Sequence, residues 1–226
     1  MLVLEGIRLV RDAVTSGMAL DEVLVAEDRS DWIEEFADRA RVVDPDVLSV
    51  ASDLATSPGI VAVGREPDGV RLAGLPLDER TRLLLVDGIA DPGNLGAVAR
   101  AAEALGVAGI GIVRGGARPW SSKALRGSMG SLLRLPVQLF ASAADAKREL
   151  SNCCHVIART RDGSSSDEFD WRGPVAIWVG SETGAASDVS ESFEGVTIPM
   201  AGRAESLNVT VAAALLLDAA RRGMNA

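Results

Sequence analysis

Three short stretches of the chain combine glycines with polar side chains that could hold a ligand and act on it. They cover residues 91–100, 179–184 and 198–208. The first two follow apolar runs that are typical of buried strands, and the third begins at the end of another such run. Because ligands of parallel α/β sheets bind beyond the carboxyl ends of the strands, we predict that the three stretches meet at one edge of a sheet.

The first stretch reads Asp-Pro-Gly-Asn-Leu-Gly over residues 91–96 and opens a helix predicted from about Leu95 to Leu105. Asn94 could supply an amide to the chemistry, or it could cap this helix. Arg100 lies two turns into the helix, where it could contact a phosphate or be a solvated charge. The two glycines of the stretch allow a tight turn and a close approach of the backbone.

The second stretch, Val-Gly-Ser-Glu-Thr-Gly over residues 179–184, places glycines where a flat ligand could lie against the backbone. Glu182 is its single carboxylate, which is either a loop acid or a member of the site. In the third stretch, Ser206 could cap the last helix, predicted from about Leu207 to Arg222. Asn208 is a weak helix former so early in a helix, so we assign it a function.

Taken in this order, the three stretches resemble the signature of the SpoU/TrmH family of RNA 2′-O-methyltransferases, in the SPOUT superfamily. The resemblance implies S-adenosyl-L-methionine as methyl donor, no metal, a trefoil knot around the cofactor site and a homodimer. By the same resemblance, the catalytic residues are Asn94, Arg100, Glu182, Ser206 and Asn208. The cofactor-binding residues are then Thr160, Gly180, Gly184, Ile198, Met200 and Leu207.

The segment Lys-Ala-Leu-Arg-Gly-Ser-Met-Gly over residues 123–130 combines bases with small residues. We interpret Lys123, Arg126 and Ser128 as RNA-binding residues that clamp a phosphate or a ribose. The alternative is an ordinary helix end with a glycine cap.

The charge of the chain is unevenly distributed. The formal net charge is −9, and residues 1–80 carry 8 basic and 17 acidic side chains, whereas residues 81–226 carry 15 of each. Five cations follow one another without an intervening acid: Arg114, Arg118, Lys123, Arg126 and Arg134. Because a local basic stretch can bind phosphate in an acidic protein, the net charge neither supports nor excludes RNA.

Other features limit the choice of function. No apolar run approaches the roughly 20 residues that a membrane helix needs, and no secretory signal begins the sequence, so we expect a cytoplasmic protein. Cys153 and Cys154 are adjacent and are interpreted as structural thiols, and the lone His155 makes a zinc site improbable. Gly-Ile-Gly-Ile-Val-Arg over residues 109–114 has an arginine in place of the third glycine of a dinucleotide fingerprint, which argues against a Rossmann NAD site.

The chain is predicted to be an α/β protein with two units. Residues 1–66 form a small α/β unit that resembles a ribosomal-protein-like RNA-binding domain, and residues 67–80 form a linker. Residues 81–226 form a parallel-sheet α/β methyltransferase domain. The predicted helices span residues 3–16, 31–39, 46–55, 95–105, 121–127, 145–150 and 207–222. The predicted strands span residues 23–26, 42–43, 60–63, 83–86, 110–113, 154–158, 175–179 and 195–198.

We expect an enzyme that methylates a ribose 2′-hydroxyl of ribosomal RNA, and of the large-subunit RNA in particular. Two readings of the same family stay open, a transfer RNA methyltransferase and a non-catalytic RNA-binding relative. A small-molecule methyltransferase is a third alternative, and the proton acceptor is left open because a guanidinium is a poor base.

Overall fold

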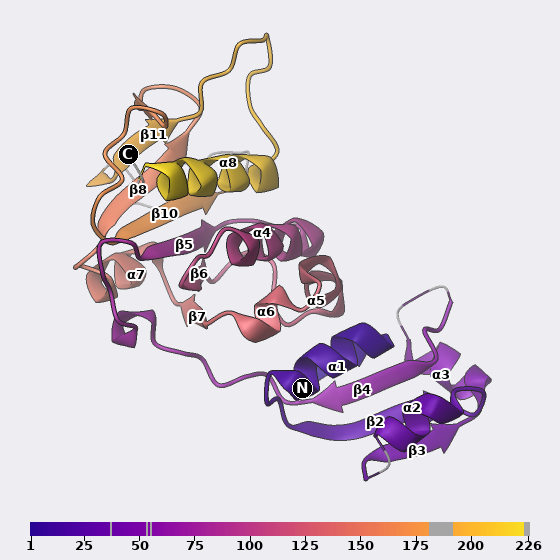
Figure 1. Cartoon of the computed structure of the whole chain (residues 1–226). Helices are drawn as coiled ribbons and strands as arrows, with labels where there is room; N and C mark the ends of the chain where they lie inside the picture. The colour runs from indigo at the N-terminus through magenta and orange to yellow at the C-terminus, as the bar shows by residue number, and fades with distance from the viewer. Residues whose placement is uncertain (37, 53, 55, 181–191, 224–226) are drawn as a thin grey trace.

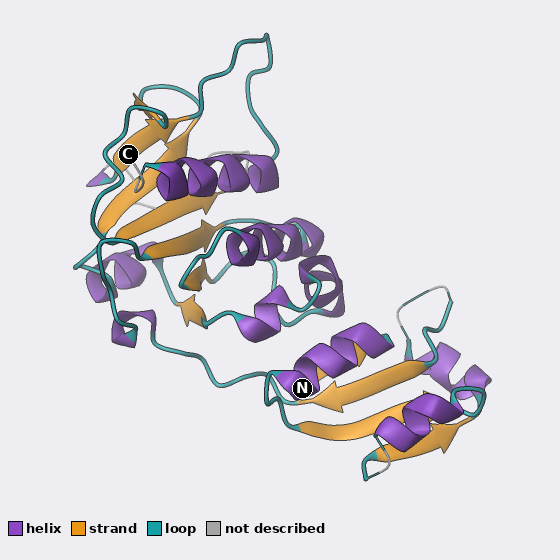
Figure 2. Ribbon diagram, viewed as in Figure 1, coloured by secondary structure: helices purple, strands orange, loops and turns teal. Residues whose placement is uncertain are grey.

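The structure is a computed structural model that describes residues 1–223, except residues 37, 53, 55 and 181–191. The described residues form two sheets, one of four strands and one of seven, each accompanied by helices (Figures 1 and 2). The α/β class with a large parallel sheet is as predicted from the sequence.

The four-stranded sheet belongs to the N-terminal unit (residues 1–66), and its strand order is β1-β4-β2-β3. Strands β1 and β2 run antiparallel to β4, whereas β3 runs parallel to β2. The elements are β1 Leu2–Glu5, α1 Ile7–Thr15, β2 Leu20–Ala26, α2 Ser30–Glu35, β3 Ala40–Val43, α3 Pro45–Ala51 and β4 Ile60–Gly64.

The prediction of one helix over residues 3–16 was wrong at its beginning. Leu2 and Leu4 are buried on one face of strand β1, and Gly6 turns the chain with a φ of 91° before α1 begins. Few residues other than glycine adopt this angle without strain, so strand and helix are separate elements. The other predicted helices of this unit are shorter than expected, since α2 ends at Glu35 and α3 at Ala51.

The seven-stranded sheet belongs to the C-terminal unit (residues 81–226) and is parallel throughout its described pairings. Its strand order is β7-β6-β5-β10-β8-β11-β9. The strands are β5 Arg82–Asp87, β6 Gly109–Val113, β7 Val137–Phe140, β8 Cys154–Arg159, β9 Ser164–Ser165, β10 Val175–Gly180 and β11 Glu194–Thr197. The helices are α4 Pro92–Ala104, α5 Ser122–Ser128, α6 Ser131–Arg134, α7 Ala143–Glu149 and α8 Val209–Arg222. Strands β7 and β9 and helix α6 were not predicted.

The order of the strands creates a switch point in this sheet. The chain moves from β5 outward through β6 to β7, and it then returns to the other side of β5. There β10 lies between β5 and β8, and β11 lies beyond β8. Such a reversal opens a crevice at the carboxyl ends of the strands, where α/β proteins bind ligands. The trefoil knot that the family resemblance implies stays a prediction.

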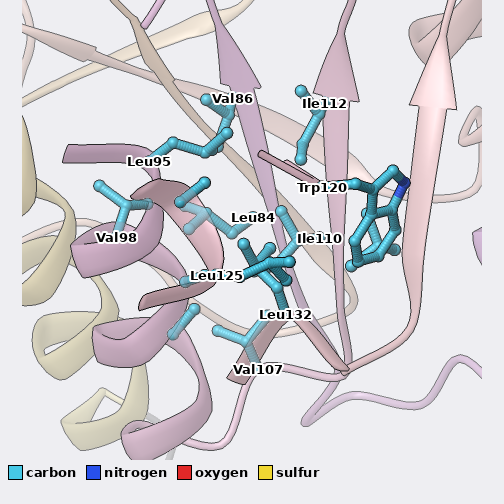
Figure 3. Packing of buried hydrophobic residues seen from close by; sticks show 14 of the residues in the cluster. Leu84, Val86, Leu95, Val98, Val107, Ile110, Ile112, Trp120, Leu125 and Leu132 are labelled. Atoms are coloured by element: carbon cyan, nitrogen blue, oxygen red, sulfur yellow. The ribbon is translucent and has the colours of Figure 1, made fainter. Parts of the chain in front are cut away.

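Both faces of the sheet are covered by apolar side chains. Figure 3 shows one face, where Leu84, Val86 and Ile110 meet Leu95 of α4 and Leu125 of α5. The opposite face carries Leu83, Leu85 and Trp178 against α7. Burial on both faces accounts for the continuous apolar strands of the sequence.

The predicted linker packs against the C-terminal unit. It contains a short 3-10 helix, Leu72–Gly74, and Leu72 is fully buried against Leu83 and Leu85. The Leu72 backbone N–H donates to Gln138 Oε1 over 2.7 Å. The segment is therefore part of the packed structure, although its composition resembles that of a free linker.

Candidate active site

Four neighbouring strands end in line at one edge of the large sheet. In the register of the sheet, Gly180 of β10 is paired with Asp87, the last residue of β5. On the other side of β10, Thr197 at the end of β11 is paired with Arg159 at the end of β8. Since neighbouring strands lie about 4.8 Å apart, the loops that follow these four strands begin within a narrow region. All four of these loops contain or lead directly to residues predicted for the site.

Helix α4 begins at this edge, and Asp91 fixes its first turn. The Asp91 side chain accepts the backbone N–H of Asn94 over 2.9 Å and a hydrogen bond from Lys123 Nζ over 2.5 Å. These hydrogen bonds, that of Lys123 first, lower the pKa of the Asp91 carboxyl. Asp91 is thus the N-cap and Pro92 the first helical residue, so the alternative in which Asn94 caps the helix is wrong. The half-buried Asn94 side chain is not used as that cap.

Arg100 lies on the exposed side of α4. On another side of the helix, Gly96 lies directly against α5. An added Cβ at Gly96 would lie 2.7 Å from the backbone nitrogen of Ser128 and 2.8 Å from the carbonyl carbon of Gly127. The close approach that we predicted for a glycine here is therefore made by a neighbouring helix, which sets the position of α4 and of Arg100.

Helix α8 brings the third stretch to the same edge. It packs against α4 and β10, and its first residues lie on the side where the arrowheads of β5 and β10 point (Figure 1). The N-cap is Asn208, whose side-chain oxygen accepts the Thr210 backbone N–H over 2.9 Å. Ser206 precedes the helix and is exposed. The alternative in which Ser206 caps the helix is wrong, and the role of Asn208 includes the cap.

The predicted cofactor residues occupy three adjacent loops. Gly180 ends β10 and is exposed, Thr160 follows β8 and is exposed, and Ile198 follows β11 and is half-buried. Met200 and Leu207 are half-buried members of the segment between β11 and α8. Glu182 and Gly184 lie outside the described residues.

These loops fit an S-adenosyl-L-methionine molecule in the nature of their groups. Gly180 leaves the end of β10 without a side chain, and an added Cβ would lie 3.2 Å from the Asp87 carbonyl oxygen. Among the described residues, the β8–β10 ladder ends at Trp178 and the β8–β11 ladder ends at Thr197, so the regular strand pairing stops at this edge. A flat nucleoside with donors and acceptors at its edge suits such a row of backbone groups.

The predicted RNA clamp is divided by the structure. Lys123 is 58% exposed and lies beside Asp91, close to the site. Arg126 forms an ion pair with Glu5 of the N-terminal unit. The Ser128 hydroxyl is buried and donates to the Leu125 carbonyl over 2.8 Å, so this hydroxyl stabilises the end of α5 and is not accessible to a ligand.

His155 is held in a structural role. Trp178 Nε1–H donates to His155 Nδ1 over 2.9 Å, and His155 Nε2 lies 3.0 Å from the Leu150 carbonyl oxygen, to which it donates as the matching tautomer. Burial lowers the pKa of the imidazole. With both nitrogens engaged, His155 does not serve as the proton acceptor of a reaction. Among the described residues, no group of three or more His, Cys, Asp or Glu side chains is arranged to hold a metal.

Sequence reasoning missed Asp91, which positions Asn94 and joins α4 to α5. The dipeptide Asp91-Pro92 carried the signal, since an aspartate N-cap followed by proline at the first helical position is a common helix start.

None of the described helices has the length and apolarity required to cross a bilayer.

The fold and the row of strand ends define a parallel α/β protein that binds a ligand at the switch point of its sheet. The sequence model of the SpoU rRNA Methylase family matches residues 81–218, and the chain belongs to this family.

Curated relatives and solved structures resemble the chain over nearly its whole length. A 23S rRNA (uridine(2479)-2′-O)-methyltransferase of Streptomyces viridochromogenes is 30% identical, over 96% of this chain and 81% of the relative. The 23S rRNA (guanosine(2553)-2′-O)-methyltransferase RlmP of Bacillus subtilis (strain 168) is 30% identical, over 95% and 86%. The AdoMet-bound rRNA methyltransferase from Sinorhizobium meliloti superposes with a TM-score of 0.86 at 25% identity, over 98% and 87%.

Proposed function

We propose that this protein transfers the methyl group of S-adenosyl-L-methionine to a ribose 2′-hydroxyl of ribosomal RNA, within the large-subunit RNA. The observation that carries the proposal is the alignment of the ends of β5, β10, β8 and β11, which gathers the family's loops at one edge. The 23S rRNA substrates of two relatives that match over nearly the whole chain support the choice of RNA.

The reaction requires a methyl donor and a ribose oxygen held in line at about 3 Å. S-adenosyl-L-methionine supplies an electrophilic methyl group on a sulfonium. The loops after β8, β10 and β11, with Thr160, Gly180 and Ile198, would hold it at the edge of the sheet. The chain's own residues then bind the RNA and hold its ribose 2′-hydroxyl in line with the methyl group.

Arg100 and Asn94 are assigned to the RNA side of the reaction. Both lie on α4, whose start is fixed by Asp91, and Arg100 is exposed. A guanidinium is a poor base, so we assign Arg100 to binding the phosphate and stabilising the developing alkoxide. Ser206 and Asn208, at the start of α8, would orient the ribose from the other side.

The N-terminal unit is proposed to contact the RNA substrate, in accord with its resemblance to ribosomal-protein-like RNA-binding domains. A ribosomal RNA substrate places the reaction where ribosomes are assembled, so a cytoplasmic location is part of this proposal.

A homodimer built through α8 is also part of the proposal. Val211 and Leu215 lie one turn apart on this helix and are 47% and 43% exposed. Two exposed branched apolar residues on one face of a helix suit a symmetric contact with a second copy. Sedimentation of the wild type and of the Leu215→Glu variant tests this, because a dimer that uses this face becomes a monomer in the variant.

The test of the reaction is the transfer of tritium from labelled cofactor to total ribosomal RNA. We expect the wild type to label the RNA and the Arg100→Ala variant to lose this activity while still binding the cofactor in calorimetry. Primer extension at low nucleotide concentration then locates the methylated ribose. Transfer to transfer RNA alone, or to a small molecule without RNA, would contradict the proposed substrate, and cofactor binding without any transfer would favour a non-catalytic relative.

A further inference from the structure

A buried ion pair joins the two units of the chain. Glu5, at the end of β1, has a fully buried side chain, and its carboxylate accepts hydrogen bonds from Ser52 over 2.7 Å and from Arg126 of α5. The Arg126 side chain is 30% exposed. Arg126, one of the two cations predicted to bind RNA, is thus occupied by a carboxylate of the N-terminal unit.

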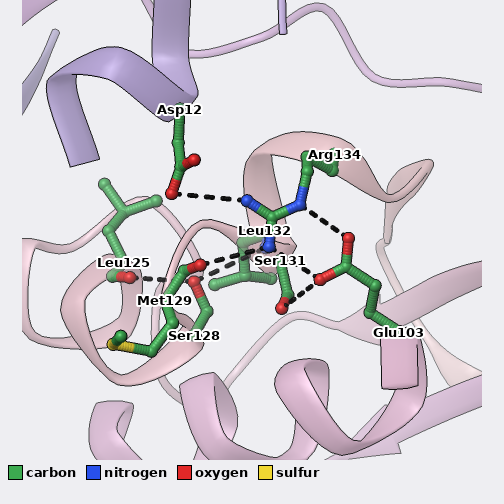
Figure 4. A network of polar contacts seen from close by, with 8 residues as sticks. All are labelled: Asp12, Glu103, Leu125, Ser128, Met129, Ser131, Leu132 and Arg134. Carbon is green, nitrogen blue, oxygen red and sulfur yellow. Dashed lines mark hydrogen bonds and ion pairs between the residues drawn. The ribbon is translucent and has the colours of Figure 1, made fainter. Parts of the chain in front are cut away.

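A second network lies beside this pair and is drawn in Figure 4. Arg134 contacts Asp12 of α1 at 3.3 Å and Glu103 of α4 at 2.7 Å, and its Nη2 also donates to the Met129 carbonyl over 3.1 Å. The bond from Arg134 lowers the pKa of the Glu103 carboxyl. Arg134 therefore connects three helices and both units.

Gly130 makes room for this network. Its φ is 85°, and an added Cβ would lie so close to Asp12 Oδ2 and Arg134 Nη1 that the ends of both side chains would have to shift. Glycine at position 130 thus suits the backbone conformation and leaves room for the contact between Asp12 and Arg134.

The segment between the two units is also held. The Val70 backbone N–H donates to the Val137 carbonyl over 3.3 Å, and Leu72 is buried against the large sheet. Glu66, at the end of the N-terminal unit, pairs with Arg118 at 2.6 Å. Because this connecting segment is fixed to the C-terminal unit, it restricts movement of the N-terminal unit away from the C-terminal unit.

Helix α5 links these contacts to the candidate active site. Arg126 of this helix contacts Glu5, and Lys123, one turn earlier, contacts Asp91, which caps α4 at Asn94. Helix α5 also packs closely on Gly96 of α4. The same short helix therefore contacts the N-terminal unit and sets the start of the helix that carries Asn94 and Arg100.

Charge limits what the N-terminal unit can contribute. Residues 1–66 carry 6 basic and 14 acidic side chains, a net charge of −8. Since RNA affinity comes largely from cations that neutralise phosphates, this unit does not hold RNA by net charge. Its influence on the substrate has to come from its shape and its position, which requires that the position be fixed.

We propose that the contacts of Glu5 with Arg126 and of Asp12 with Arg134 form a rigid joint, and that this joint determines which ribose of the RNA reaches the site. The proposal rests on the proposed RNA substrate. With the joint intact, the acidic N-terminal unit excludes RNA from the α5–α6 side and leaves one path to the edge of the large sheet. With the joint loosened, Arg126 and Arg134 become available to phosphate and other riboses gain access.

The test compares full-length Glu5→Gln/Asp12→Asn and Gly130→Ala variants with the wild type. The first removes two negative charges with little change of shape, and the second keeps every charge. Tritium transfer to total ribosomal RNA and primer extension measure selectivity, as the ratio of methylation at the main ribose to methylation elsewhere. We expect selectivity to fall by about tenfold or more, since small misplacements of a substrate cost up to about 100-fold in rate.

Cofactor affinity measured by calorimetry is the readout that a folding defect would change, and we expect it to stay at the wild-type value. If the doubly substituted variant does not bind the cofactor, the Gly130→Ala variant decides. Arg148→Gln is the matched control, because it removes an exposed ion pair with Asp145 inside the C-terminal unit. Wild-type selectivity in both joint variants overturns this proposal alone, whereas a wild type that methylates no RNA overturns the proposed function and this proposal with it.

Discussion

The edge of the large sheet and the joint between the two units use the same kinds of side chain in opposite ways. At the joint, Arg126 and Arg134 contact Glu5, Asp12 and Glu103, and the Glu5 carboxylate is buried. At the edge, Arg100 is an exposed residue of α4 for which the structure records no ion pair among the residues it describes. An arginine without a carboxylate partner is available to a phosphate, whereas a paired one stabilises the fold.

The basic stretch of residues 114–134 shows that a run of cations in a sequence does not identify a binding surface. Four of its five cations pair with acids that lie far away in the sequence, Arg118 with Glu66 and Lys123 with Asp91 in addition to the two of the joint. Only Arg114, exposed after β6, has no ion pair among the described residues. Substitutions at Arg100 and Arg126 separate the two uses of charge, and substitutions at Asn208 and His155 extend the comparison.

The largest effect is expected at the edge of the sheet. Arg100→Ala should lower kcat for RNA methylation by on the order of 100-fold, because it removes a cation that stabilises developing negative charge. Urea unfolding should change little, since the side chain is exposed on α4. A variant that is markedly less stable but fully active per folded molecule would place Arg100 with the joint instead.

At the joint, in contrast to Arg100, we expect a substitution to lower stability markedly. Arg126→Met should lower the free energy of unfolding by about 3 kcal/mol, because it leaves the Glu5 carboxylate buried without its cation. Urea denaturation measures this, with Arg148→Met as control, whose exposed pair with Asp145 should contribute less than about 1 kcal/mol. Equal losses of stability in the two variants would show that the buried ion pair contributes no more than an exposed one.

Asn208 combines a structural role with a predicted chemical one, because it caps α8 and is also predicted to be catalytic. Asn208→Ala should cost about 1 kcal/mol of stability through loss of the bond to the Thr210 N–H. Asn208→Ser should retain most of this stability, since serine caps helices nearly as well. If Asn208→Ser also keeps full methyl-transfer activity, the role of Asn208 is limited to the cap.

The smallest effect concerns the dependence of stability on pH through His155. Burial lowers the pKa of this imidazole below its ordinary value of 6.5, so the unfolded chain binds a proton more readily than the folded one. The stabilisation is therefore complete above about pH 6.5 and decreases as the pH falls toward the lowered pKa. Thermal unfolding between pH 7.5 and 5.5 should show a shallower decline in His155→Gln than in the wild type, and identical slopes would contradict the assignment.

Much of the C-terminal unit could be predicted from the sequence because local patterns decide it. Apolar runs such as residues 83–86 and 175–179 form strands that are buried on both faces, and the polar stretches after them follow the carboxyl ends. Strand β7 could not be recognised, because it has only four residues and Leu139 is exposed. The beginning of the chain was misread because Ile7, Val10 and Val14 have helical spacing and the strand before them is equally apolar.

The partners of the charged residues could not be predicted, because they depend on contacts between distant parts of the chain. Glu5 and Arg126 are 121 positions apart, and no local pattern indicates that they meet. Lys123 and Asp91, 32 positions apart, pair because Gly96 lets α5 approach α4. The residues proposed for the site were found through the family resemblance, and their roles stay predictions.

The position of β10 between β5 and β8 has a consequence for how the protein is made. When synthesis has reached β8 but not β10, the edge of β5 that will pair with β10 has no partner strand. Strand β8 is then also not connected to the rest of the sheet. An unpaired, fully apolar strand border is prone to pair with other chains. The nascent protein therefore depends on prompt arrival of its last third, which inserts the missing strand.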